Sequence, residues 1–185
     1  MIQLTLVQWL LLAGSLILLL SLVLQKTYNT IILKRNQVKT DLADVDVQLK
    51  RRSGLIDNLV LLVKDYAKHE KDTFQEVARA RAAIDTSKTV GESAAADSML
   101  SKTLRSLFMV VESYPKLQAS ENYKQLRDDL SQSENLIADY REAYNLSVQD
   151  YNTYIQLFPN LLAASLFGFG DEPLFTAREV SVVKK

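Results

Sequence analysis

The sequence predicts an all-α membrane protein, in which an N-terminal transmembrane helix precedes an up-and-down four-helix bundle. Three observations carry this prediction. The first 25 residues hold no charged side chain, apolar residues recur afterwards at alternating spacings of three and four, and only five Gly and three Pro occur. Such spacing marks amphipathic helices, which bury their apolar stripes against each other when short loops join them. The expected domains are an anchor at 1–25, a bundle at 26–158 and a tail at 159–185 that is apolar and then frayed.

The apolar run from Leu4 to Leu24 predicts an uncleaved membrane anchor. As a helix this run spans ~31 Å, which matches the hydrocarbon thickness of a bilayer. A signal peptide is the rival interpretation, but the run lacks the basic n-region and the small-x-small cleavage site of one. The cations that follow predict a single-pass protein of the inner membrane, with a short N-terminus outside and a cytoplasmic bundle: Lys26, Lys34, Arg35 and Lys39.

Two apolar stripes follow the anchor, from Tyr28 to Leu49 and from Leu55 to Ile84. Gly54 lies between them and weakens a helix by ~1 kcal/mol relative to Ala, so a turn or a kink is expected there. Two arrangements stay open. The chain forms either four bundle helices with a turn at Gly54, or three long helices with a bend near Gly54.

The second half of the sequence predicts two further helices and a tail. Ser87–Asp97 has the Gly and small polar residues of a loop, and Asp97 or Ser98 is the expected cap of a helix that Pro115 ends. The last long helix is expected from Ser120 to Gln156. The apolar tail after it is expected to cap the bundle, lie on the membrane surface or bind a partner.

Composition and motifs argue against several classes of function. The 22 basic and 22 acidic residues balance and form no basic block with interleaved aromatics, so no nucleic-acid partner is expected. Without cysteine there is no thiol catalysis and no Cys-ligated metal, and no nucleotide-binding loop or nucleophile elbow occurs. We therefore infer no enzyme activity, cofactor, metal or small-molecule substrate. The carboxylates that acid–base chemistry would need are interpreted as solvated helix faces or arginine partners: Glu70, Glu112, Glu134 and Glu142.

His69 is the single histidine. It begins like the HExxH zinc motif, but the fifth residue is Thr73, and a di-iron bundle would need Glu-x-x-His on two helices. Neither site can be built, so an exposed position on a helix face is expected for His69.

Arg35 is the first polar residue that the pattern singles out, because it lies on an apolar stripe between Ile31 and Val38. A buried guanidinium requires a carboxylate or several carbonyls. Arg35 therefore either joins a polar network that sets the bundle register or receives a partner, or extends toward the lipid interface.

Two Tyr-Asn pairs, Tyr144-Asn145 and Tyr151-Asn152, lie seven residues apart on the last stripe, and Tyr28-Asn29 opens the first one. The tyrosine rings are expected to fill the bundle seam, with a partner for each buried hydroxyl. The asparagines are expected at its edge, where an amide reaches a neighbouring helix or solvent and helps fix the register. We interpret the pairs as packing and not as a catalytic signature.

Four stretches together resemble the LemA family of bacterial membrane proteins in order and spacing: "YNTIILKRNQV", "VQLKRRSGLIDNLVLLVKDYAKHE", "ESYPKLQASENYKQL" and "YREAYNLSVQDYNTYIQLFPN". The resemblance covers about Tyr28 to Phe169. It implies an N-terminal membrane helix, a four-helix bundle and an outside N-terminus, and it assigns no catalytic residue. Family members usually have Asp-Leu-Ile-Pro-Asn where this chain has Gly54-Leu55-Ile56-Asp57-Asn58. Because that proline is missing, a continuous bent helix competes with a turn here.

Two functional hypotheses follow. The first is a membrane-tethered, non-enzymatic scaffold or adaptor of the bacterial cell envelope, which holds a protein partner or its own copies near the bilayer. The alternative is a sensing or accessory subunit of a membrane complex, for example with an envelope protease. That subunit would dock through the apolar segment Leu161 to Phe169. The resemblance adds an association of the family with envelope proteases and no mechanism.

Overall fold

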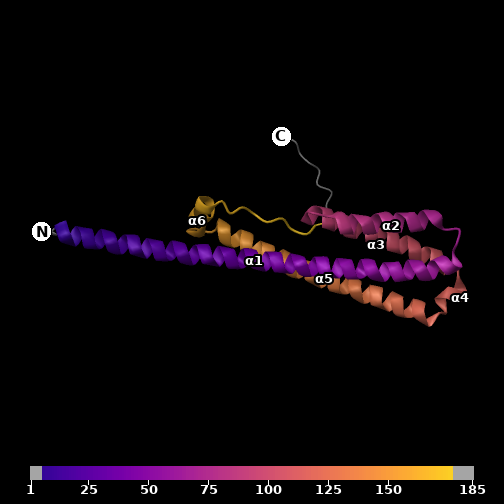
Figure 1. The fold of residues 1–185 in the computed structure, drawn as a ribbon. Helices are drawn as coiled ribbons and strands as arrows, with labels where there is room; N and C mark the ends of the chain where they lie inside the picture. The colour runs from indigo at the N-terminus through magenta and orange to yellow at the C-terminus, as the bar shows by residue number, and fades with distance from the viewer. Residues whose placement is uncertain (1–5, 177–185) are drawn as a thin grey trace. The chain divides into compact units, whose positions relative to one another are not determined.

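The computed structural model describes residues 6–176, and residues 1–5 and 177–185 lie outside the description. The described part of the chain contains six helices and no strand (Figure 1). The all-α prediction is therefore confirmed.

α1 runs without interruption from Leu6 to Tyr66. Of the two arrangements that the sequence leaves open at Gly54, the turn is therefore wrong and the helix continues through this residue. The buried stripe continues past Gly54 through residues that are at most 1% exposed: Val45, Leu49, Ile56, Leu59 and Val63. Burying a single aliphatic side chain contributes about 1.5–3 kcal/mol, which outweighs the ~1 kcal/mol that one helical Gly costs. The chain turns instead at residues 67–70, where neither Gly nor Pro marks the place.

α2 spans Lys71–Thr86 and α3 spans Val90–Glu112. The expected loop over Ser87–Asp97 is thus much shorter, and Asp97 lies inside α3 and not at its cap. The reason is a capping box: the Thr89 hydroxyl accepts from the Glu92 N–H, and the Glu92 carboxylate accepts from the Thr89 N–H. These bonds start the helix ahead of Gly91, which the sequence pattern assigned to the loop.

The second half of the chain holds a single-turn helix, the long helix and a short one: α4 (Pro115–Gln118), α5 (Glu121–Gln156) and α6 (Asn160–Phe167). The long helix agrees with the expectation of Ser120 to Gln156 to within one residue. Gly168 ends α6 with a φ of 71°, a left-handed conformation that glycine adopts without Cβ strain. Residues 170–175, which we call the strap, have no regular secondary structure.

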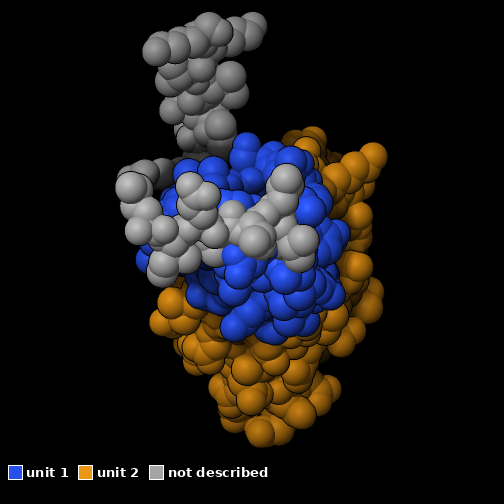
Figure 2. All heavy atoms as spheres, turned by 90° about the vertical axis from the view of Figure 1, so that its left-hand side faces the viewer, with its two compact units in different colours: residues 1–39, 147–172 blue, residues 40–146, 173–185 orange. Residues whose placement is uncertain are grey.

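The described residues divide into two compact units (Figure 2). Unit 1 contains the residues up to Lys39 together with Ser147–Glu172, and unit 2 contains Thr40–Leu146 together with the residues from Pro173. α1, α5 and the strap each contribute to both units. Each unit has its own buried apolar residues.

Unit 2 is the helical bundle. Its four long segments, from α1, α2, α3 and α5, run alternately in opposite directions (Figure 1). Their facing stripes form a core in which the largest aliphatic side chains are almost fully buried: Leu49, Ile56, Leu59, Leu100, Leu107, Leu130 and Ile137. The expected up-and-down arrangement of four helices is found in this unit.

Unit 1 combines the N-terminal part of α1 with the end of α5, α6 and the first residues of the strap. Its buried residues come from each helix: Ile31, Val38, Val148, Tyr151, Ile155, Ala163 and Ala164. Beyond them, the leucines of α1 from Leu10 to Leu24 are exposed. Among the described helices, only α1 is both long and apolar enough to cross a membrane.

Candidate functional site

In unit 1, the pair Tyr151-Asn152 on α5 binds main-chain groups of the strap. The Tyr151 hydroxyl donates to the carbonyl oxygen of Gly170 at 3.0 Å. The Asn152 side chain uses both of its polar atoms on Glu172, donating to the carbonyl oxygen and accepting from the N–H, each at 2.9 Å. Burial raises the pKa of the Tyr151 hydroxyl, which therefore stays protonated and remains a donor. The tyrosine ring itself fills the core, with no exposed surface.

Arg35 reaches the same part of the strap from α1. Its Nε donates to the Glu172 carboxylate at 2.9 Å, with 41% of the Arg35 side chain and 26% of the Glu172 side chain exposed. The residue before Arg35, Lys34, pairs with Asp150 of α5. The predicted Arg35 position is thus half-buried and has a carboxylate partner within the chain. Its role for another protein stays a prediction.

In unit 2, Tyr144-Asn145 makes the corresponding set of bonds. The Tyr144 hydroxyl donates to the Pro173 carbonyl oxygen at 2.7 Å. The Asn145 side chain accepts from the N–H of Phe175 at 2.8 Å and donates to its carbonyl oxygen at 3.4 Å. The Phe175 ring is 2% exposed, lies edge-on to Tyr144 with centroids 6.4 Å apart, and has the Arg141 guanidinium 4.9 Å above it. Phe175 is therefore an anchoring side chain for the strap.

The two sets of bonds follow one rule. Each tyrosine binds the carbonyl of one strap residue, and the asparagine after it binds both main-chain groups two residues further along. Seven residues of helix rise ~10.5 Å and three residues of nearly extended chain span ~10 Å, so one repeat on α5 corresponds to three residues on the strap. The asparagines were expected to reach a helix or solvent. They bind the strap instead, which sequence periodicity could not show.

The third pair, Tyr28-Asn29, differs from the other two. The Tyr28 ring packs against Phe167 and Phe169, with centroid distances of 4.8 and 5.7 Å, and Asn29 is exposed. This copy of the dipeptide therefore contacts aromatic rings at the C-terminal end of α6 and not the strap.

Unit 2 also contains a buried polar cluster that lies outside the predicted site residues. Arg52 of α1 and Asp97 of α3 are both buried and form an ion pair at 3.2 Å. Arg141 of α5 binds the other oxygen of Asp97 at 3.2 Å, and the Ser101 hydroxyl accepts from Arg52 at 3.0 Å. Burial raises the pKa of Asp97, while the two arginines favour its charged form. The cluster joins three helices of unit 2 through one carboxylate.

A signal for this cluster is present in the sequence. Arg52 lies three residues after Leu49 and four before Ile56, so it occupies the apolar stripe as Arg35 does. Ending the stripe at Gly54 concealed that position. The Gly and small polar residues before Asp97 predict a cap there, whereas α3 already begins at Val90.

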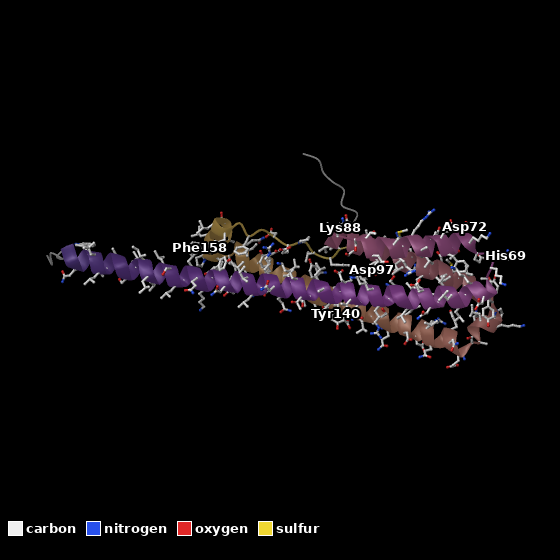
Figure 3. The ribbon with its side chains drawn as sticks, viewed as in Figure 1. His69, Asp72, Lys88, Asp97, Tyr140 and Phe158 are labelled. Carbon is white, nitrogen blue, oxygen red and sulfur yellow. The ribbon has the colours of Figure 1, made fainter. Side chains whose placement is uncertain are left out.

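The predicted solvated positions can also be located. His69 is exposed but lies in the turn between α1 and α2 and not on a helix face, which corrects that expectation (Figure 3). Glu112, Glu134 and Glu142 are exposed. Within residues 6–176, no group of three or more His, Asp or Glu side chains is arranged to hold a metal ion.

Comparison with known proteins gives one family and several relatives. The sequence profile of the LemA family matches residues 41–185. The magnetosome protein MamQ of Magnetospirillum gryphiswaldense is 27% identical over 186 aligned residues, covering 80% of this chain and 68% of that protein. Magnetosome proteins MamQ 1 and MamQ 2 of Paramagnetospirillum magneticum are each 26% identical, with the same shares covered.

Proposed function

The chain belongs to the LemA family, and on that premise we propose that it is a non-enzymatic, membrane-tethered scaffold or adaptor of the bacterial cell envelope. The family, its relatives and the apolar part of α1 indicate a membrane-associated protein. The scaffold role goes further, and one observation carries it: an exposed groove of unit 2 whose lining suits a protein helix.

The groove lies between the end of α1 and the start of α5 and has a volume of about 490 Å³. Four leucines line it: Leu55, Leu61, Leu62 and Leu126. Leu61 is 64% exposed, although it belongs to a helix of the bundle. The remaining lining is acidic or amide: Asn58, Asp65, Asn122, Gln125 and Asp129. A groove lined by leucines together with polar side chains is the kind of surface that binds an amphipathic helix.

The charge of the groove specifies the partner. Two carboxylates line it and no basic residue does. Electrostatic complementarity therefore favours an amphipathic helix with Lys or Arg beside its apolar face. Membrane proteins carry such basic segments on the cytoplasmic side of their spans. The proposed partner is accordingly the basic juxtamembrane helix of a membrane protein in the same bilayer.

The proposed orientation places the short N-terminus outside and unit 2 in the cytoplasm, in the inner membrane. The cations after the apolar run support it, because Lys and Arg count in this rule while neighbouring carboxylates contribute little. Since the chain has no cysteine, Ser113→Cys, an exposed position at the end of α3, reports the side of unit 2. We expect no labelling by an impermeant maleimide in intact cells. Labelling of Ser113→Cys before lysis contradicts the orientation.

Site-specific photo-cross-linking tests the groove. A benzophenone amino acid at Leu61 should capture one reproducible membrane protein in native membranes. The same amino acid at Leu146, another exposed leucine of unit 2 (59% exposed), should not. With the cross-linker moved to Asn58, which also lines the groove, the substitution Leu61→Lys should abolish the capture. The new lysine places a positive charge where the basic partner helix binds. Equal capture from Leu61 and Leu146, or none from Leu61, rejects the groove. Capture of a second copy makes the protein a self-assembling scaffold.

The alternative function, an accessory subunit that docks through Leu161–Phe169, draws support from the exposed leucines of α6. Phe167 and Phe169 of that segment pack on Tyr28, which follows the apolar run of α1. This position next to the membrane helix favours lipid, and not a protein partner, as the neighbour of the segment. The groove of unit 2 therefore carries the proposed function.

A further inference from the structure

α6 and the residues around it form an exposed apolar surface in unit 1. Between Leu157 and Gly170 the chain has no charged side chain. Ala163 and Ala164 face inward and are buried, while the larger side chains are between 46% and 81% exposed: Phe158, Leu161, Leu162, Leu166 and Phe167. Figure 3 marks Phe158 at the start of this segment. Contiguous apolar surface of this kind marks a site of contact with a protein, a ligand or a membrane.

The position of α6 in unit 1 identifies which contact it makes. The Phe167 ring packs edge-on against Tyr28, with centroids 4.8 Å apart. Phe167 also lines a recess of about 270 Å³ together with Ser21, Leu24, Gln25 and Tyr28 of α1. Ser21 and Leu24 belong to the apolar run that forms the membrane segment. The C-terminal end of α6 is therefore level with the last turn of that segment.

We propose that α6 lies in the interfacial layer of the bilayer that holds α1, as a second membrane contact of the chain. Phe158 and the exposed leucines then face acyl chains near the headgroups. Tyr28, with Phe167 and Phe169 packed on it, lies at the level where aromatic side chains anchor membrane proteins. Lys26 is exposed two residues before Tyr28 and meets lipid phosphates at that level.

The charge pattern sets the depth of the segment. The uncharged stretch ends at Gly170, and Asp171 and Glu172 follow at once, with Glu172 paired to Arg35. Carboxylates are costly in hydrocarbon, so the strap begins on the aqueous side of the interface. Since α6 is only eight residues long, it rests on the membrane and does not cross it. This inference requires α1 as the anchor and is independent of a partner in the groove of unit 2.

Fluorescence quenching in full-length protein reconstituted in phosphatidylcholine–phosphatidylglycerol nanodiscs tests the proposal. An environment-sensitive probe is attached to Leu162→Cys on α6, in a chain with no other cysteine. Thr153→Cys is the control, because it is exposed in unit 1 but belongs to α5 and lies before the apolar segment that starts at Leu157. The probe at 162 should be quenched several-fold more than the probe at 153 by lipids with a nitroxide near the headgroup. Aqueous iodide should quench the two probes in the opposite order.

Three other outcomes overturn the proposal. Equal iodide quenching at both positions places α6 in water. A probe at 162 that neither quencher reaches is covered by protein, which assigns the surface to a second copy of the chain. If the lipid nitroxide does not quench a probe at Val23→Cys in the apolar run either, the apolar run of α1 does not lie in the bilayer. A paired Leu162→Glu and Leu166→Glu variant, probed at Phe158→Cys, should lose lipid quenching several-fold while Val23→Cys keeps it.

Discussion

The Asn152 side chain binds both main-chain groups of Glu172, accepting from its N–H and donating to its carbonyl at 2.9 Å in each case. An asparagine amide has one acceptor and one donor group, so this arrangement satisfies both with a single strap residue. Asn145 repeats the arrangement with Phe175 in unit 2. Both asparagines bind main-chain atoms of the strap and not its side chains. The contacts therefore do not depend on which side chain the strap residue carries.

Asn152→Ala should lower the free energy of unfolding of the full-length protein by about 1–3 kcal/mol, because it leaves the Glu172 main-chain groups without their partners. Chemical denaturation in detergent, followed by circular dichroism, measures the change. Asn29→Ala is the matched control. It also follows a tyrosine in unit 1 but is exposed, and it should change the free energy by less than about 0.5 kcal/mol. Equal effects of the two substitutions contradict the assigned role of the Asn152 amide.

Arg35→Ala should have a smaller effect than Asn152→Ala, although both residues bind Glu172. The Arg35–Glu172 pair is 41% and 26% exposed, and ion pairs of this kind contribute no more than about 1 kcal/mol. Raising the salt concentration should reduce the difference between wild type and Arg35→Ala, because salt screens exposed pairs. If Arg35→Ala lowers the free energy of unfolding more than Asn152→Ala does, or if salt does not change its effect, Arg35 belongs to a buried network and not to an exposed ion pair.

Arg52 and Asp97 should prove strongly coupled. Removing one member of a buried pair leaves an uncompensated charge and costs on the order of 3–5 kcal/mol. Arg52→Met and Asp97→Leu should each be destabilising, and the double variant should cost clearly less than their sum in a double-mutant cycle. Arg51→Met is the control, since Arg51 is the exposed neighbour. If the losses of unfolding free energy are additive, or equal at positions 51 and 52, the Arg52–Asp97 pair does not stabilise the core of unit 2.

The start of α3 should respond to acid. The main-chain N–H groups of Lys88 and Thr89 donate to Glu92 and lower the pKa of its carboxyl from the ordinary 4.5. A carboxyl with a lowered folded-state pKa stabilises the folded state above its unfolded pKa and loses that effect as the pH falls through its folded pKa. Hydrogen-exchange protection factors in the first turn of α3 should therefore fall as the pH drops below 4.5.

Glu92→Gln provides the control for this titration. Glutamine keeps an acceptor oxygen but has no charge to lose, so the acid-dependent part of the change should disappear. The same dependence in wild type and Glu92→Gln would assign it to other carboxyls.

The fold was predictable where local signals and packing agree. The long C-terminal helix ends at Gln156, just before Phe158-Pro159, and its stripe of Tyr144, Val148, Tyr151 and Ile155 is buried as its spacing predicts. The continuation of α1 through Gly54 was not predictable, because a weak local signal for a turn competes with tertiary burial of Ile56 and Leu59, which no local rule weighs. Thr89 and Glu92 did carry the signature of a helix start, but the Gly and Ser around them obscured it.

The candidate site was predictable only in part. Periodicity placed the tyrosines at the seam and the asparagines beside them. Their partners lie in a segment without periodicity, 19 to 30 residues further along the chain. Contacts of that kind depend on how the chain returns after Gly168, and no spacing in the sequence encodes that return.

The strap has a consequence for biosynthesis. A ribosome makes the chain from the N-terminus, so α1 can enter the bilayer while the end of α5 is still being made. Asn145 and Asn152 gain their main-chain partners only after residues 170–175 have been released. A protein truncated before Gly170 therefore keeps its anchor but exposes unmatched amides on α5, and quality-control proteases should remove it more quickly than the complete chain.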